Sequence, residues 1–111
     1  MSKREAKLYV EDIKESIEKI NRYTKGMKFD ELVEDDKTID AVVRNLAIIG
    51  EAVINIPEEI KEKYSDMPWF EIKGMRNRVV HEYFGTDNKI LWDTIKGDIP
   101  KLKEQIEKIV L

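Results

Sequence analysis

The residues of this chain best suited to catalysis fall within residues 74–85. This segment contains the single histidine of the chain, His81, and Arg76 lies five positions before it. Neutral imidazole can accept a proton at pH 7, because the reference pKa of histidine is about 6.5. A guanidinium stays protonated and presents a planar fork of donors, so it can stabilise negative charge in a transition state. The pair could therefore combine proton transfer with stabilisation of developing negative charge.

A regular helix through this segment would not aim both side chains at one point. Asn77 and His81 are four positions apart and would share a face, whereas Arg76 and His81 would be separated by about 140° around the axis. Arg76 could reach the same site if its side chain turned back, and a second subunit could help to complete the cleft. The alternative is a surface helix with a histidine near its C-terminus, where the helix dipole favours positive charge. Both interpretations stay open on these residues alone.

Other chemistries find little support in the residue types. The sequence contains neither G-x-x-x-x-G-K-[ST] nor G-x-G-x-x-G, so nucleotide binding by those loops is unsupported. Cysteine is absent, which excludes disulfides and thiolate metal sites. The cluster Glu34, Asp35 and Asp36 is better explained as the acidic N-terminus of a helix than as a metal site. We therefore expect no metal and no cofactor.

The charge balance restricts where nucleic acid could bind. Charged residues make up 39% of the chain, and the net charge is −3. This balance gives no general reason to expect nucleic acid, so an RNA site would have to be a local patch. Lys73, Arg76 and Arg78 form the densest positive cluster outside the N-terminus, and a patch is expected there.

The length and the N-terminus point to a small cytoplasmic protein. The chain has 111 residues, and we expect a single domain over residues 1–111. Charged residues follow soon after Met1, so no signal peptide is expected. No apolar run approaches the roughly 20 residues of a membrane-spanning helix, so no membrane partner is expected.

The fold is expected to be all-α, an up-and-down bundle of four to five helices. Apolar residues recur with helical periodicity, and no segment alternates as a strand does. Gly97 and Pro100 should kink or split the last helix. The expected helices cover about residues 2–22, 37–55, 57–64, 66–83 and 88–109, with a loop and one helical turn in residues 27–36.

The helix that carries residues 74–85 has its own local signals. Ser65 or Asp66 is expected to cap it. Trp69 and Phe70 are expected to face the core, as large aromatic residues of a helix usually do.

The second helix suggests a partner subunit. Residues 41–54 are apolar on more than one face, and a helix that is apolar nearly all round must be buried nearly all round. The core of a domain of this size can bury one face of this helix. A second apolar face would need another protein surface to cover it, which favours a homodimer.

The motif resembles that of HepT-type toxins of the HEPN superfamily. Arg76, Asn77 and His81 match the R-[polar]-x(3)-H signature of HEPN ribonucleases, and Tyr83 extends the match to the R-x(4)-H-x-Y form. The resemblance covers nearly the whole chain, which makes it specific where R-x(4)-H alone would be weak. Further matching positions are Arg44, Asn45, Leu46, Ile48, Ile49, Gly50, Glu51, Ala52, Pro57, Trp69, Gly74, Met75, Glu82, Phe84, Trp92, Asp98, Ile99 and Pro100.

The resemblance implies metal-independent cleavage of RNA. A ribose 2′-hydroxyl would lose its proton to His81 and attack the adjacent phosphate, while Arg76 stabilises the transition state. A 2′-hydroxyl nucleophile would also explain a preference for RNA over DNA. Asn77 could orient either group, and Glu51 on the neighbouring helix is a weaker candidate for the same role. Lys73 and Arg78 are expected to contact RNA phosphates.

Tyr83 has a separate implied role in control. In HepT-type toxins of type VII toxin–antitoxin systems, the matching tyrosine accepts AMP from a nucleotidyltransferase antitoxin of the MntA type. A bulky anion two residues from His81 would repel RNA phosphates. The partner uses the ATP, so this chain would need no cofactor.

Two alternatives from other functional classes stay open. The chain could be a non-catalytic dimeric helical module that binds a partner protein, which its net charge favours. It could also be a substrate-binding subunit of the nucleotidyltransferase, the pair acting as one modifying enzyme.

Overall fold

The computed structural model describes the backbone of residues 3–82 and 87–111, and the side chains of residues 5–79 and 87–111. Within this part the chain is helical and contains no strand, as the periodicity predicts. The elements in chain order are α1 (Lys3–Thr24), α2 (Phe29–Val33), α3 (Asp36–Asn55), α4 (Glu58–Lys63), α5 (Trp69–Glu82), α6 (Asn88–Asp93), the π-helical segment η1 (Thr94–Asp98) and α7 (Ile99–Ile106).

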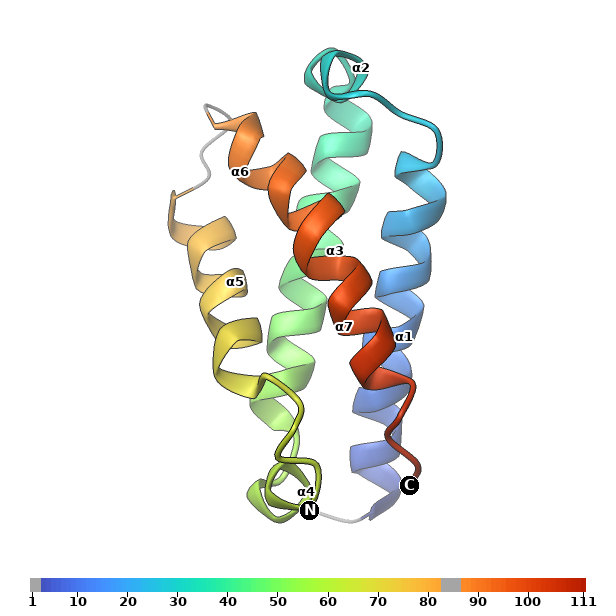
Figure 1. The fold of residues 1–111 in the computed structure, drawn as a ribbon, viewed down its shortest axis with the longest axis vertical. Helices are drawn as coiled ribbons and strands as arrows, with labels where there is room; N and C mark the ends of the chain where they lie inside the picture. Colours follow the sequence, from blue (N-terminus) through green and yellow to red (C-terminus); the bar gives the residue numbers. More distant parts are fainter. Residues whose placement is uncertain (1–2, 83–86) are drawn as a thin grey trace.

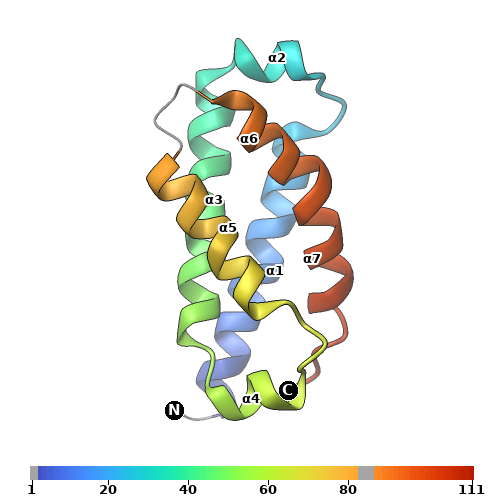
Figure 2. The ribbon, with the colours of Figure 1, turned by 60° about the vertical axis from the view of Figure 1, so that its left-hand side comes forward.

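The long helices form a bundle with α3 at its centre. α3 packs against α1 on one side and against α5 on the other (Figure 1). The run from α6 through η1 to α7 crosses the front of the bundle, and its α7 part packs on α1 (Figures 1 and 2). The two short helices α2 and α4 lie at opposite ends of the bundle. The all-α bundle expected from the sequence is therefore confirmed.

The core follows the apolar stripes of the sequence. The i, i+4, i+7 pattern of α1 is buried in full, because it faces α3 and α7. The stripe of the last helical run is buried as well, apart from Ile90, which is partly exposed. The buried stripe of α1 consists of Ala6, Val10, Ile13, Ile17 and Ile20.

The helix ends match the local signals in most places. α1 ends at Thr24, and Gly26 follows with φ 74°, a left-handed conformation that favours glycine. Asp35 caps α3 and accepts hydrogen bonds from the Thr38 backbone N–H (3.0 Å) and hydroxyl (2.7 Å). These bonds lower the pKa of the Asp35 carboxyl. The acidic run before α3 therefore contains a helix cap, as expected.

The capping expected for α5 is wrong. α5 begins at Trp69, three residues after Asp66, so neither Ser65 nor Asp66 adjoins its first turn. Pro68 directly precedes the helix instead and accepts the N–H of Ile72.

The orientation expected for Phe70 is also wrong. Its side chain is 83% exposed, because the buried face of α5 is set by Ile72, Met75 and Val79, and Phe70 lies on a different face. Trp69 is half-buried against the core, where its Nε1 donates to the Tyr64 carbonyl at 3.1 Å.

The last helical run is deformed where Gly97 and Pro100 were expected to kink or split it. The residues of η1 widen to a π-helical turn, in which the Ile99 N–H donates to the Thr94 carbonyl five positions earlier. Pro100 has no N–H to continue the α-helical pattern, so a local change of hydrogen bonding is the expected response. The helix therefore continues through the deformation rather than splitting.

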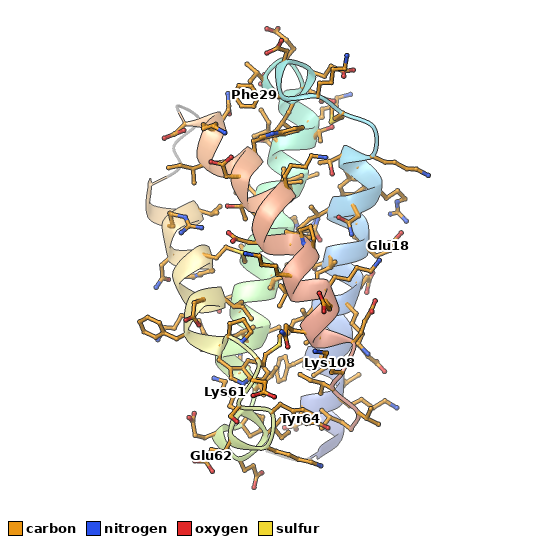
Figure 3. The ribbon with its side chains drawn as sticks, viewed as in Figure 1. Glu18, Phe29, Lys61, Glu62, Tyr64 and Lys108 are labelled. Atoms are coloured by element: carbon orange, nitrogen blue, oxygen red, sulfur yellow. The ribbon has the colours of Figure 1, made fainter. Side chains whose placement is uncertain are left out.

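The C-terminal residues are attached to the bundle by Tyr64. Its hydroxyl donates to the Val110 carbonyl at 2.9 Å and accepts the Val110 N–H at 3.2 Å. Figure 3 shows Tyr64 at the α4 end of the bundle, in the same region as Lys108. No helix in the described ranges combines the length and apolar composition that crossing a bilayer requires.

Candidate active site

Arg76 lies at a close contact between α5 and α3. Gly50 is buried on α3, and a Cβ atom added to it would overlap Cβ and Cγ of Arg76. The aliphatic part of Arg76 therefore rests on the backbone of α3, in space that any residue other than glycine would fill.

Glu51 holds the head of Arg76. Arg76 Nη2 donates to Glu51 Oε1 at 2.6 Å, a charge-assisted bond between α5 and α3. The Arg76 side chain is 23% exposed and that of Glu51 is 56% exposed, so the pair opens to solvent on the carboxylate side. The structure thus brings together two residues that are 25 positions apart in the sequence.

Asn77 holds the other arm of the guanidinium. Arg76 Nη1 donates to Asn77 Oδ1 at 3.0 Å, so the arginine turns back along its own helix. Asn77 and position 81 are one turn apart on the same face of α5. The guanidinium therefore lies on the side of α5 that carries Asn77.

The guanidinium keeps hydrogen-bonding capacity for a ligand. Two of its five N–H donors are used, by Glu51 and Asn77. Its Nε is buried and makes no hydrogen bond to the described residues. A bound anion that drew Arg76 outward would satisfy donors for which the described residues provide no acceptor.

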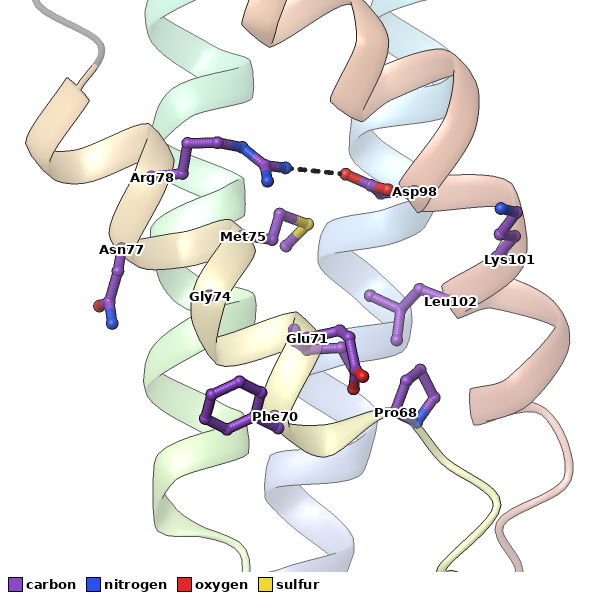
Figure 4. A pocket seen from close by; sticks show the side chains of 11 residues that line it. Pro68, Phe70, Glu71, Gly74, Met75, Asn77, Arg78, Asp98, Lys101 and Leu102 are labelled. Atoms are coloured by element: carbon purple, nitrogen blue, oxygen red, sulfur yellow. Dashed lines mark hydrogen bonds and ion pairs between the residues drawn. The ribbon is translucent and has the colours of Figure 1, made fainter.

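Arg78 faces away from this pair. It lies about 200° around α5 from Arg76, and its Nη2 donates to Asp98 Oδ2 of η1 at 3.1 Å. Figure 4 shows Arg78 reaching across to Asp98, while Asn77 projects to the other side of α5. Lys73 is exposed on α5 and has no ion pair with the described residues. The three expected cations thus share a helix but not a face.

A groove of about 840 Å³ separates α5 from the last helical run. Asn77 lies at its rim as well as beside Arg76, so the groove adjoins the candidate site (Figure 4). The residues that line it are Pro68, Phe70, Glu71, Ile72, Gly74, Met75, Asn77, Arg78, Asp98, Lys101 and Leu102.

The side chains of two expected site residues, His81 and Tyr83, lie outside the described part of the structure. The backbone of His81 belongs to α5, one turn after Asn77, and its side chain lies outside the described residues. Tyr83 lies outside the described residues entirely.

Two contributing residues were not assigned a role from the sequence. The signal for Gly50 is its place inside a long apolar helix, where glycine costs about 1 kcal/mol relative to alanine and so needs a packing reason. Asp98 gives no comparable signal in the sequence, because an acidic residue on a helix with many charges does not indicate which basic residue of α5 it will pair with.

Over almost its whole length, the chain is similar to proteins that are named, provisionally, as ribonucleases. The family described as "Ribonuclease HepT-like" matches residues 13–109. A protein of Thermococcus cleftensis named as a probable ribonuclease HepT is 47% identical over 107 residues, which cover 96% of this chain and 97% of that protein.

Proteins of two further organisms are similar, and both are provisionally named as RNases. One from Caldanaerobacter subterraneus is 45% identical over 92% of this chain and 91% of its own length. One from Methanocaldococcus jannaschii is 43% identical over 99% of this chain and 91% of its own length. The comparison with solved structures found no match.

Proposed function

Because the chain belongs to the HepT-like ribonuclease family, we propose that it is a metal-independent endoribonuclease and the toxin of a type VII toxin–antitoxin system. The observation that carries the proposal is the way in which Arg76 is packed and hydrogen-bonded. Its aliphatic part rests on Gly50, and its guanidinium is held by Glu51 and Asn77. A preorganised guanidinium with unused donors suits a phosphate that gains negative charge during the reaction.

The proposed reaction is an attack by a ribose 2′-hydroxyl on the adjacent phosphate. Arg76 binds the phosphate oxygens, and His81 transfers a proton. Asn77 and Glu51 orient Arg76, while Lys73 and Arg78 contact phosphates on either side. The reaction needs no metal, because the substrate itself supplies the nucleophile.

Expression in a host cell tests this proposal. Wild-type protein should arrest growth and degrade cellular RNA, and His81→Ala should do neither at equal expression. A non-catalytic partner-binding module would leave growth unchanged in both cases, and equal arrest by both proteins would contradict the proposed catalytic site.

We also propose that the protein is a homodimer with α3 and α5 near the interface. Ile54 is 43% exposed on α3, and Phe70 is 83% exposed on α5. Apolar residues of this size favour a covered surface. Light scattering at micromolar concentration should give twice the chain mass of 13.1 kDa; a mass near that of one chain would contradict the dimer.

Tyr83 is the proposed site of control. A nucleotidyltransferase antitoxin of the MntA type would attach AMP there, and the added phosphate would repel RNA beside Arg76 and His81. Tyr83→Phe removes the acceptor oxygen and should resist neutralisation while keeping its ribonuclease activity. After co-expression with the partner, mass spectrometry should find AMP on the wild type and on Tyr23→Phe but not on Tyr83→Phe. AMP on another tyrosine alone would exclude this assignment.

A further inference from the structure

The proposed cleavage needs two proton-transfer groups. The 2′-hydroxyl must lose a proton as it attacks, and the leaving 5′-oxygen must gain one. In an in-line displacement these two oxygens lie on opposite sides of the phosphorus. One imidazole cannot lie beside both oxygens at once, and the chain has a single histidine. A second group must therefore act, and it can come from another residue of this chain or from His81 of the second subunit in the proposed homodimer.

Glu51 lies beside the group that is proposed to bind the phosphate. Its Oε1 is held by Arg76 at 2.6 Å, which places the carboxylate next to the group proposed to bind the phosphate. Its Oε2 makes no hydrogen bond to the described residues, and 56% of the side chain is exposed. Glu51 also comes from α3, whereas Arg76 and His81 both come from α5. The carboxylate and the guanidinium can therefore contact a bound phosphate from two different helices.

Space for a substrate lies directly beside Glu51. A hollow of about 320 Å³ between α1 and α3 includes Glu51 in its wall, together with Tyr9, Asp12, Arg44 and Asn55. Arg44 has no ion pair with the described residues, so its guanidinium is available to bind a phosphate. The half-buried ring of Tyr9 offers a surface for a base or a ribose.

We propose that Glu51 is the general base of the reaction and that His81, which the resemblance implied to be the base, is the general acid. This proposal rests on the proposed ribonuclease function. Glu51 takes the proton of the 2′-hydroxyl, the 2′-oxygen forms a bond to phosphorus, and the bond from phosphorus to the 5′-oxygen breaks. The imidazolium of His81 gives its proton to that oxygen. The products are a 2′,3′-cyclic phosphate and a 5′-hydroxyl, and water later restores both protonation states.

A carboxylate that only positions Arg76 would behave differently. Glutamine in its place keeps an oxygen that can accept the same hydrogen bond, but it cannot accept a proton. It also removes a negative charge that repels RNA. Glu51→Gln therefore separates the two roles, since a positioning role survives the change in large part and a general base does not.

The first test compares pH profiles of cleavage for wild type, Glu51→Gln and His81→Ala on one single-stranded RNA oligonucleotide. Glu51→Gln should lower kcat by about 10²–10⁴-fold without raising KM, and should lose the fall in rate on the acidic side. His81→Ala should lose the fall on the alkaline side. Asp40→Asn removes a charge from the same helix at an exposed position and should match wild type. A Glu51→Gln rate within threefold of wild type would overturn the proposal. So would a fall in cleavage rate at low pH that is lost only in His81→Ala.

The second test uses a substrate with sulfur in place of the leaving 5′-oxygen, at a cleavage position mapped with the wild type. A thiolate leaves without a proton, because the reference pKa of a thiol is only about 8.5. This substrate should restore cleavage by His81→Ala but not by Glu51→Gln. Rescue of Glu51→Gln alone would reverse the roles and overturn the assignment. A wild type that cleaves neither RNA would instead overturn the proposed function, and this assignment with it.

Discussion

Replacing Arg76 or His81 by alanine is expected to lower RNA cleavage by about 10²–10⁴-fold while the protein stays folded. Loss of His81 removes a proton-transfer group. Loss of Arg76 removes the fork that stabilises the transition state, and Arg76→Lys should restore little, because an ammonium cannot bind two phosphate oxygens in the same way. Single-turnover cleavage measures the loss, and circular dichroism checks the fold.

The matched control is Arg22→Ala. Arg22 is an exposed arginine on α1, and its pair with Glu18 is a surface pair one turn away. Such pairs contribute about 0.3–0.5 kcal/mol, so this variant should cleave RNA as the wild type does. If His81→Ala cleaves within threefold of wild type, the proposed catalytic site is wrong.

Gly50→Ala is expected to damage both stability and activity, although glycine in a helix usually costs stability. At most helical positions the change to alanine stabilises by about 0.4–1 kcal/mol. At Gly50 the new Cβ would overlap Cβ and Cγ of Arg76, so α5 must move away from α3. Overpacking of this kind costs about 1–3 kcal/mol, and a displacement of about 1 Å in a catalytic group can cost about 10²-fold in rate.

Gly74→Ala supplies the comparison for this prediction. Gly74 lies inside α5, and a Cβ added there would meet nothing within 4 Å. Thermal unfolding should show Gly74→Ala at or above the wild-type midpoint and Gly50→Ala below it. If the Gly50→Ala protein is as stable and as active as wild type, the close packing of Arg76 against Gly50 is wrong.

Local patterns predicted the helices and the core well. The stripe of α1, the burial of the last helical run and the cap at Asp35 all depend on residues within a few positions of one another. Periodicity and capping report such relations directly. The deformation near Pro100 followed from its missing N–H.

Tertiary relations were harder to predict. Phe70 was expected in the core because large aromatic residues usually lie there, but the buried face of α5 is defined by its contact with α3. The pairing of Arg76 with Glu51 was anticipated only as a weak option, since a position on the neighbouring helix does not give the register between the two. The role of Gly50 was missed for the same reason.

The net charge of −3 also concealed the local electrostatics. Arg76 and Arg78 were expected to form one positive patch with Lys73. Each arginine instead has a carboxylate from another helix, Glu51 or Asp98. Because one faces α3 and the other faces the α5–η1 groove, RNA would have to contact two faces of α5 or displace these pairs.

The chemistry of the cleaved ends tests the central claim most directly. Purified protein is incubated with a single-stranded RNA oligonucleotide in EDTA, and the products are identified by mass spectrometry. Wild type should yield 2′,3′-cyclic phosphate and 5′-hydroxyl ends, with no cleavage where the attacking ribose is 2′-deoxy. Products with 3′-hydroxyl and 5′-phosphate ends, or cleavage that occurs only after a divalent metal is added, would contradict a reaction in which the RNA supplies its own nucleophile.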